Sequence, residues 1–186
     1  MAGGETELIS RAQQGYRSAF SELVSRHYPV VIRVIHRMCG DVQSAEDAAQ
    51  ETFIKAWLNL ATYNPRSPLR NWLCRIAINT TLDMMRKRTP ATMDDEATLM
   101  IPDHLPGPEA VVIQNERITL LHQAIQHLPE ATRSVLVLKE YGGLTYQEIA
   151  TSLEIPLGTV MSRLNYARTR LKDCLQVQLL AEVGNG

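Results

Sequence analysis

The feature that most constrains the fold is the spacing of apolar residues, which recur at three- and four-residue steps through much of the chain. This spacing puts them on one side of an α-helix, whereas a half-buried strand would alternate apolar and polar residues. Short alternating runs are absent, and helix-favouring residues such as Leu, Ala, Arg and Glu are frequent. We therefore predict an all-α protein. Its 186 residues, 45% of them hydrophobic, fit two small helical domains joined by a flexible linker.

Three helices are expected in the first domain, which we place at residues 1–88. The first helix carries a long apolar stripe. The second begins near Ser44, since Ser44 followed by Asp47 resembles a capping arrangement. A loop at residues 63–68 follows, because its two prolines oppose helix, and the third helix runs from about Leu69 to Arg88. The stripe of the first helix consists of Phe20, Leu23, Val24, Tyr28, Val31, Ile32, Ile35 and Met38.

The third expected helix has two distinct faces. One face is largely apolar and should be buried, while another side brings together Arg75, Asn79 and Arg86 at helical spacing. Cationic and amide side chains grouped in this way are suited to binding an anion. The residues predicted to be buried are Leu69, Trp72, Leu73, Ile76, Ala77 and Thr80.

Residues 89–108 separate the two predicted domains. They lack helical periodicity, contain four prolines and a glycine, and all four of their charged residues are acidic. This composition predicts a linker rather than a helix. The net charge of −1 for the whole chain therefore hides an uneven distribution, because residues 1–88 carry 12 basic and 8 acidic side chains.

The second domain, placed at residues 109–186, is expected to contain a helix-turn-helix. Thr145 and Glu148 have the spacing of a capping box at the start of a short helix. A tight turn at residues 154–155 then leads to Pro156, which opens the next helix. Two helices joined by so short a turn are typical of a helix-turn-helix.

The second helix of this pair carries an outward face suited to DNA. In the major groove, arginine pairs with guanine and asparagine with adenine. Farther along the helix lie residues that would reach backbone phosphate, namely Arg168, Arg170 and Lys172. The alternative is a solvated charged face on an ordinary bundle helix. The inward residues are Val160, Leu164, Ala167, Leu171 and Leu175, and the outward ones are Ser162, Arg163, Asn165, Tyr166 and Arg168.

Cysteine and histidine usage argues against several other classes of protein. Cys39, Cys74 and Cys174 are odd in number and far apart, so neither a disulfide framework nor a zinc site is expected. The five histidines are scattered, and no nucleophile–base signature or glycine-rich phosphate loop is present. No apolar run approaches the ~20 residues that span a bilayer. We expect a cytoplasmic protein with no catalytic residues, metal or cofactor and no insertion into a membrane.

Three segments together resemble one known family. They are AEDAAQETFIKAW at 45–57, WLCRIAINTTLD at 72–83, and the stretch from LPEATRS to LNYAR at 128–168. In order and spacing they resemble the polymerase-binding helix, the minus-ten helix and the minus-thirty-five domain of bacterial RNA polymerase sigma factors of the extracytoplasmic-function (ECF) type. The resemblance implies a non-enzymatic subunit that binds core RNA polymerase, directs it to specific promoters and assists transcription initiation and promoter melting.

The resemblance also implies partners and the residues that meet them. Asp47, Gln50 and Glu51 match positions that the family presents to the clamp of the largest polymerase subunit, and the second domain implies a contact with the flap of the second-largest subunit. An anti-sigma factor is a further expected partner. The positions matching the minus-ten DNA surface are Tyr63, Asn64, Arg66, Arg70, Trp72, Arg75, Asn79 and Arg86. Those matching the minus-thirty-five DNA surface are Thr159, Ser162, Arg163, Asn165, Tyr166 and Arg168.

Alternatives remain for several of these residues. By itself, the polar face at 47–51 also fits a solvated surface, and Trp72 at helical spacing also fits a core position. A DNA-binding regulator that never joins polymerase would need only the C-terminal domain, so the face at 47–51 argues against that class. The scattered histidines argue against an enzyme.

Overall fold

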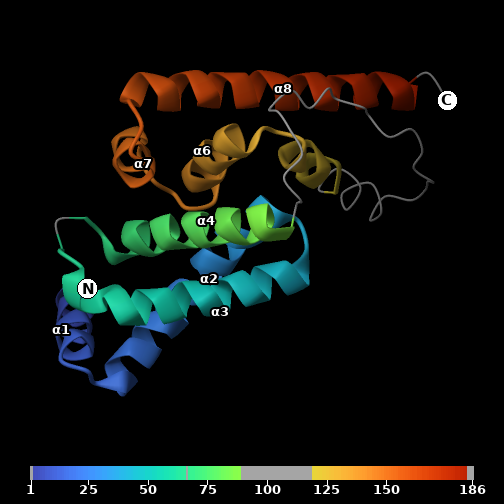
Figure 1. Cartoon of the computed structure of the whole chain (residues 1–186). Helices are drawn as coiled ribbons and strands as arrows, with labels where there is room; N and C mark the ends of the chain where they lie inside the picture. The colour runs from blue at the N-terminus through green and yellow to red at the C-terminus, as the bar shows by residue number, and fades with distance from the viewer. Residues whose placement is uncertain (1, 66, 89–118, 184–186) are drawn as a thin grey trace.

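The computed structural model describes residues 2–65, 67–88 and 119–183, with side chains for 4–65, 67–87 and 119–176, and all its regular elements are helices. This confirms the all-α prediction (Figure 1). The linker predicted at 89–108 lies outside the described residues, as do residues 109–118 at the start of the second predicted domain. The elements are α1 (Ala2–Gln13), α2 (Arg17–Cys39), α3 (Val42–Asn59), the 3-10 helix η1 (Leu60–Thr62), α4 (Leu69–Arg88), a helical segment at 119–126, α6 (Glu130–Glu140), α7 (Tyr146–Leu153) and α8 (Leu157–Val183).

The junction between α2 and α3 corrects the predicted cap. Gly40 ends α2 in the left-handed region, at φ 84°, and its N–H donates to the carbonyl of His36 at 2.9 Å. Asp41, not Ser44, is the N-cap of α3, because its carboxylate accepts from the N–H of Ser44 at 2.7 Å. Ser44 therefore lies inside the first turn and is buried.

The apolar stripe of α2 is buried largely as predicted, with two differences. Tyr28 is 40% exposed and stacks on the ring of Phe53, with ring centroids 6.2 Å apart. Val34, which the stripe omitted, is fully buried. The reason for the second difference is that α2 contacts α6 in addition to α1, α3 and α4, so its C-terminal half is covered on more than one side.

The first apolar core lies among α1, α2, α3 and α4. Helix α1, which the sequence patterns did not single out, closes one side of it with Leu8, Ile9 and Ala12. Gln13 at its end donates to the carbonyls of Leu60 at 3.0 Å and Tyr63 at 3.1 Å, which ties α1 to the loop before α4.

The second apolar core joins the N-terminal and C-terminal helices. From α2 it takes Val34 and Met38, and from α4 it takes Cys74 and Ile78. The remaining members come from the C-terminal helices, which lie across α4 with α6 and α7 between α4 and α8 (Figure 1). The two halves of the chain are thus packed together. The members that the C-terminal half contributes to this core are Ile125, Leu128, Val135, Leu136, Val137, Leu138, Leu144, Ile149, Ala150, Val160, Leu164 and Ala167.

A buried arginine ties the same two halves together through polar contacts. Arg133 on α6 donates to the carbonyl of Met38 at 2.7 Å, to that of Leu128 at 3.0 Å and to Gln126. Burial lowers the pKa of Arg133 from its ordinary value. Gln126 in turn donates to the carbonyl of Arg37 at 2.8 Å. The end of α2 is therefore held by side chains that come from the C-terminal half.

Candidate functional site

The residues predicted to meet polymerase lie on the outer side of α3. The cap at Asp41 fixes where the helix begins, and its buried stripe, which includes Ala45, Ala49 and Phe53, packs into the first core. Gln50 is exposed, and Glu51 is half-buried with a carboxylate oxygen 3.7 Å from the Lys55 ammonium. The surface is polar and acidic at its centre.

A groove between α3 and α4 brings this surface next to part of the predicted minus-ten surface. It has a volume of about 630 Å³, with Asp47 and Glu51 on one side and Arg86 on the other. Arg86 is exposed and lies 3.6 Å from a carboxylate oxygen of Asp83. The other lining residues are Lys55, Thr80, Asp83, Met84 and Lys87.

Two exposed apolar residues of α3, which the sequence patterns missed, lie next to the polar residues of its outer side. Ile54 is 55% exposed and Leu58 is 72% exposed. At helical spacing they follow Asp47 and Glu51 along one side of α3. The sequence signal that would have identified them is that they are apolar although they lie outside the buried stripe of the helix, where a surface facing only water would usually carry polar residues.

The predicted DNA-binding residues of the loop before α4 differ in their exposure to solvent. Tyr63 is buried, with 6% exposed, and its hydroxyl donates to the carbonyl of Ser67 at 2.6 Å. Burial, and to a lesser extent the charge of Glu5, raises the pKa of Tyr63. Asn64 is exposed, while Arg66 lies outside the described residues. In this conformation, Asn64 is available to a ligand and the ring of Tyr63 is not.

Helix α4 divides its predicted DNA-binding residues between two surroundings. Asn79 is exposed, whereas Trp72 is half-buried with its ring centroid 5.2 Å from that of Tyr63. Arg70 and Arg75 donate to groups of the C-terminal half. Among the residues predicted to be buried, Ile76 is only half-buried, and Cys74 and Ile78 are fully buried instead because the C-terminal helices cover that side of α4.

The predicted helix-turn-helix is formed by α7 and α8. The hydroxyl of Thr145 accepts from the N–H of Glu148 at 3.3 Å, and the Glu148 carboxylate accepts from the N–H of Thr145 at 2.7 Å, so both bonds of the capping box are present. The Thr145 N–H, more than any other group, holds the pKa of Glu148 below its usual value. Glu154 ends α7 with φ 56°, and Pro156 precedes α8.

The outer face of α8 presents most of the residues predicted to read DNA. Ser162, Asn165, Tyr166 and Arg168 are exposed, and Thr159 and Arg163 are half-buried. Their positions are set by three fully buried residues on the opposite side, since these hold the helix against α6 and α7. The three buried residues are Val160, Leu164 and Ala167.

Several of these side chains already have partners on the surface. Arg168 donates to the hydroxyl of Tyr146 at 3.5 Å and lies 3.4 Å from the carboxylate of Glu140. Arg170 donates to the hydroxyl of Tyr166 at 3.2 Å. These contacts hold the side chains of Tyr166 and Arg168 against neighbouring groups.

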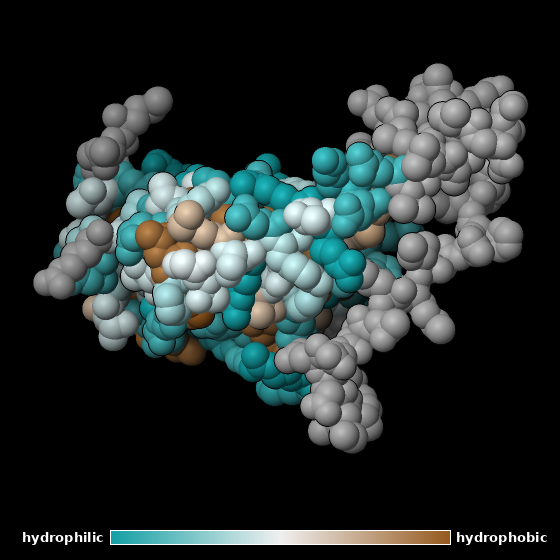
Figure 2. All heavy atoms as spheres, turned by 90° about the horizontal axis from the view of Figure 1, so that it is seen from above, coloured by the Kyte–Doolittle hydropathy of each residue, from teal (hydrophilic) through white to brown (hydrophobic). Residues whose placement is uncertain are grey.

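An apolar area accompanies the polar face of α8. Figure 2 looks down on the molecule from the side of α8 and shows hydrophobic surface towards the end where α7 and the start of α8 lie. Leu157 and Met161 at the start of α8 are 41% and 49% exposed. Neither was among the predicted site residues. Apolar side chains of this kind contact the methyl group of thymine in the major groove.

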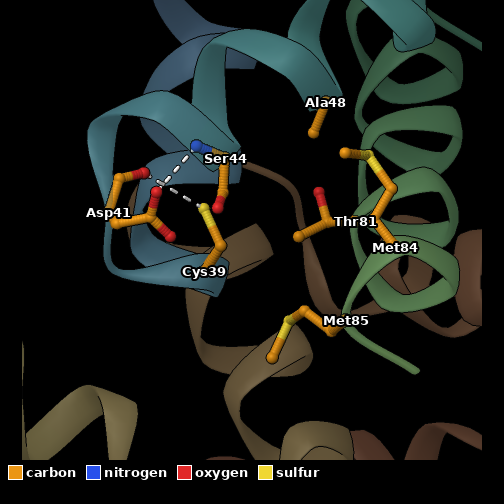
Figure 3. Close-up of a pocket in the computed structure, with 7 residues that line it drawn as sticks. All are labelled: Cys39, Asp41, Ser44, Ala48, Thr81, Met84 and Met85. Atoms are coloured by element: carbon orange, nitrogen blue, oxygen red, sulfur yellow. Dashed lines mark hydrogen bonds between the residues drawn. The ribbon is translucent and has the colours of Figure 1, made fainter. Parts of the chain in front are cut away.

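A smaller pocket of about 210 Å³ lies where α2 ends, α3 begins and α4 ends. Figure 3 shows Cys39, Met84 and Met85 around it, with Asp41 and Ser44 joined by the capping hydrogen bond. None of the predicted site residues lines this pocket. Within the described ranges, no group of three or more His, Cys, Asp or Glu side chains is placed to hold a metal ion, and no helix is long and apolar enough for a bilayer span.

Two sequence families match the chain. The family described as Sigma-70 region 2 matches residues 23–90, and the family described as Sigma-70, region 4 matches residues 118–171. The first match covers most of α2 and all of α3 and α4, and the second covers α6, α7 and the first half of α8.

Whole proteins match over nearly the full length. The RNA polymerase sigma-H factor of Pseudomonas aeruginosa is 38% identical over 92% of this chain and 94% of its own length. The ECF RNA polymerase sigma factor SigW of Bacillus subtilis is 33% identical over 90% of this chain and 95% of its own. CnrH, solved in complex with the cytosolic domain of CnrY, has a TM-score of 0.70 and 25% identity over 94% of this chain and 98% of that one.

Proposed function

The chain belongs to the ECF family of RNA polymerase sigma factors, and from that premise we propose which of its surfaces perform the family's task. The protein binds core RNA polymerase and directs it to specific promoters in transcription initiation. It takes part in this process as a regulator of transcription. We add that it carries no catalytic residue of its own, needs no cofactor and works in the cytoplasm, where polymerase and promoter are found.

The outer side of α3 is the proposed polymerase-binding surface. Asp47, Gln50 and Glu51 would meet a basic helix on the clamp of the largest polymerase subunit, since acidic and amide groups complement it. Ile54 and Leu58, exposed on the same helix, would add an apolar contact at the edge of this surface. The C-terminal helices α6, α7 and α8 would contact the flap of the second-largest subunit.

The loop before α4 and the exposed part of α4 are the proposed minus-ten surface. Taking a base out of the stack costs a few kcal/mol, which cationic and stacking contacts must offset. Asn64, Asn79 and Arg86 are exposed and support this assignment. Tyr63 would need the loop to rearrange, because its ring is buried. We further propose that this surface assists promoter melting.

The observation that carries the proposal is the helix-turn-helix of α7 and α8. Its capping box and its buried stripe leave Asn165 exposed and Arg163 at the edge of the same outer surface, as a helix that enters the major groove requires. We propose that this surface reads the minus-thirty-five element. Its binding partner in the resting cell would be an anti-sigma factor. The relative RpoE from Bartonella quintana, solved with the anti-sigma factor NepR, has the same fold, with a TM-score of 0.66 and 24% identity.

Run-off transcription with core polymerase on genomic fragments tests these assignments. Arg163→Ala should weaken promoter recognition by about 1–3 kcal/mol if the guanidinium makes a bidentate contact with a base. Glu51→Ala should weaken association with core polymerase, measured directly by co-migration. Glu46→Ala, an exposed carboxylate on the same helix, and Arg17→Ala, an exposed arginine of α2, are matched controls. Transcription by both variants at the parent level would refute the assignments.

A further inference from the structure

The loop before α4 is closed by hydrogen bonds that Tyr63 makes. Its N–H donates to the carbonyl of Leu60 at 3.1 Å, and its hydroxyl donates to the carbonyl of Ser67 at 2.6 Å. The ring of Tyr63 is 6% exposed, and its centroid lies 5.2 Å from that of Trp72. Tyr63 therefore joins the two ends of the loop from the inside, while the neighbouring Asn64 is exposed.

Gln13, the last residue of α1, holds the same loop from another helix. Its side-chain amide donates to the carbonyls of Leu60 at 3.0 Å and Tyr63 at 3.1 Å. A primary amide has two N–H donors, so it can supply both of these bonds. The carbonyl of Tyr63 belongs to the planar peptide unit whose nitrogen is that of Asn64. Gln13 therefore fixes the orientation of the main chain where Asn64 begins.

The bonds of Gln13 and Tyr63 meet at one acceptor. The carbonyl of Leu60 accepts from the side-chain amide of Gln13 and from the N–H of Tyr63, which its two lone pairs allow. Leu60 is itself 2% exposed and belongs to the first core. The main chain that leads to Asn64 is thus connected to a buried residue at one end and to α1 along its side.

Helix α1 is well placed to keep Gln13 in position. Leu8, Ile9 and Ala12 are buried in the first core, and α1 contacts both α2 and η1. The Sigma-70 region 2 match begins at residue 23, so α1 precedes the matched segment. The helix that holds the loop therefore lies outside the part of the chain that this family defines.

A loop that binds an unstacked base gains from being ordered in advance. Fixing the main chain of a residue costs conformational entropy, and a loop that is free before binding must bear this cost when it binds. Here the contacts of Gln13 and Tyr63 order the chain next to Asn64 before any ligand is present. Removing them should weaken the selection of a base more than it weakens the fold.

We propose that Gln13 is a positioning residue for promoter recognition, because it holds the main chain at Asn64 in the conformation that receives an unstacked base of minus-ten DNA. The inference rests on the proposed function, which assigns the loop to the minus-ten element, and it adds a residue of α1 to that function. Gln13 acts through the loop and does not itself touch DNA. With the loop held in this way, the buried Tyr63 supports Asn64 from within.

The base preference of transcription tests this role. The full chain is assembled with core polymerase on a genomic fragment that the parent transcribes, and each base pair of the minus-ten element is substituted in turn. The ratio of transcript from the unaltered fragment to that from an altered fragment measures discrimination at that base pair. Asn64→Ala identifies the base pair that the loop reads, as the position where this ratio falls.

Gln13→Met removes both donors and keeps a side chain of similar length. It should lower the ratio roughly fivefold at the base pair that Asn64→Ala identifies and leave the other ratios unchanged. Gln14→Met is the matched control and should discriminate like the parent, since the exposed amide of Gln14 donates to the hydroxyl of Ser10 within α1, at 3.4 Å.

Two results would overturn the positioning role. One is a set of ratios for Gln13→Met equal to those for Gln14→Met, even with less transcript overall, because a merely weakened protein behaves in that way. The other is an equal fall at every base pair, since the loop should affect the base that it reads.

Amide hydrogen exchange tests the contact without polymerase or DNA. Gln13→Met should speed exchange of the Tyr63 N–H roughly fivefold relative to Gln14→Met, because the segment that contains the Leu60 carbonyl is no longer held by α1. Equal exchange in the two variants would also overturn the inference. A parent that transcribes no fragment, or Asn64→Ala with the parent's ratios, would instead refute the proposed function of the loop, with the exchange result intact.

Discussion

The arginines of this protein divide between buried and exposed roles, and the sequence spacing alone did not separate them. Arg133 is 7% exposed, and its hydrogen-bond partners among the described residues are the carbonyls of Met38, Leu128 and Gln126 and the side-chain amide of Gln126. A guanidinium presents five donors, so it can satisfy several carbonyls that water cannot reach. Arg86, by contrast, is exposed beside Asp83.

Replacing Arg133 should therefore cost stability rather than DNA affinity. Arg133→Leu leaves buried carbonyls without donors, and we expect the free energy of unfolding to fall by roughly 3 kcal/mol. Urea unfolding at neutral pH measures it. Arg17→Ala, which removes an exposed arginine, should change stability by less than about 0.5 kcal/mol. A loss no larger than that of the control would show that the carbonyls find water instead.

At the scale of elements, helix termini position the proposed surfaces. Asp41 sets the start of α3 and hence which side carries Asp47 and Glu51. Thr145 and Glu148 set the start of α7, and the same Glu148 accepts from Asn71 of α4. Glu148 thus has a local role in the capping box, which the sequence spacing predicts, and a distant contact with Asn71, which the spacing does not predict.

Loss of the capping box should weaken the C-terminal helices selectively. Thr145→Ala removes the hydroxyl that accepts from the N–H of Glu148, with an expected cost of about 1 kcal/mol in unfolding free energy. Thr151→Ala is the matched control, since its exposed hydroxyl only donates to the carbonyl of Gln147 within α7. Amide hydrogen exchange should locate the loss in α7. Equal exchange in the two variants would contradict the assigned role of the cap.

At the scale of the whole molecule, the shared core couples two groups of helices that match two separate sequence families. Val34, Met38, Cys74 and Ile78 would each expose apolar surface if the halves separated completely. Separation is therefore unfavourable for the protein alone, and a partner that covers this surface or binds the freed cations must supply the difference.

The coupling between the two halves of the chain should be visible in urea unfolding curves. Both tryptophans, Trp57 and Trp72, lie in the N-terminal half, so their fluorescence follows that half alone, whereas far-UV circular dichroism follows all helices. Because of the shared core, we expect the two urea transitions to coincide. Ile78→Ala should lower both midpoints together, with a cost of about 2–5 kcal/mol. Fluorescence and circular dichroism curves with different midpoints would show that the halves unfold independently.

Much of the fold and part of the site follow from local patterns. The bounds of α4, the capping box at Thr145 and Glu148, the turn before Pro156 and the buried stripe of α8 were all predictable, because helix periodicity and termini depend on residues within a few positions of one another. The cap of α3 was misplaced by three residues, since Ser44 and Asp41 are both suitable capping residues and only geometry distinguishes them.

By itself the sequence determined that the chain is helical, where most of its helices begin, and which helix faces carry cations, amides and carboxylates. Only the tertiary structure decided which of those faces are covered: it buried Tyr63 and Arg133, exposed Ile54 and Leu58, and placed Arg70 and Arg75 against the helix-turn-helix. The physical reason is that a helix face is set by spacing of three and four residues, whereas the groups that cover it can come from far along the chain, 50 positions away for Gln13 against Tyr63 and more than 70 for the contacts of Arg70 and Arg75.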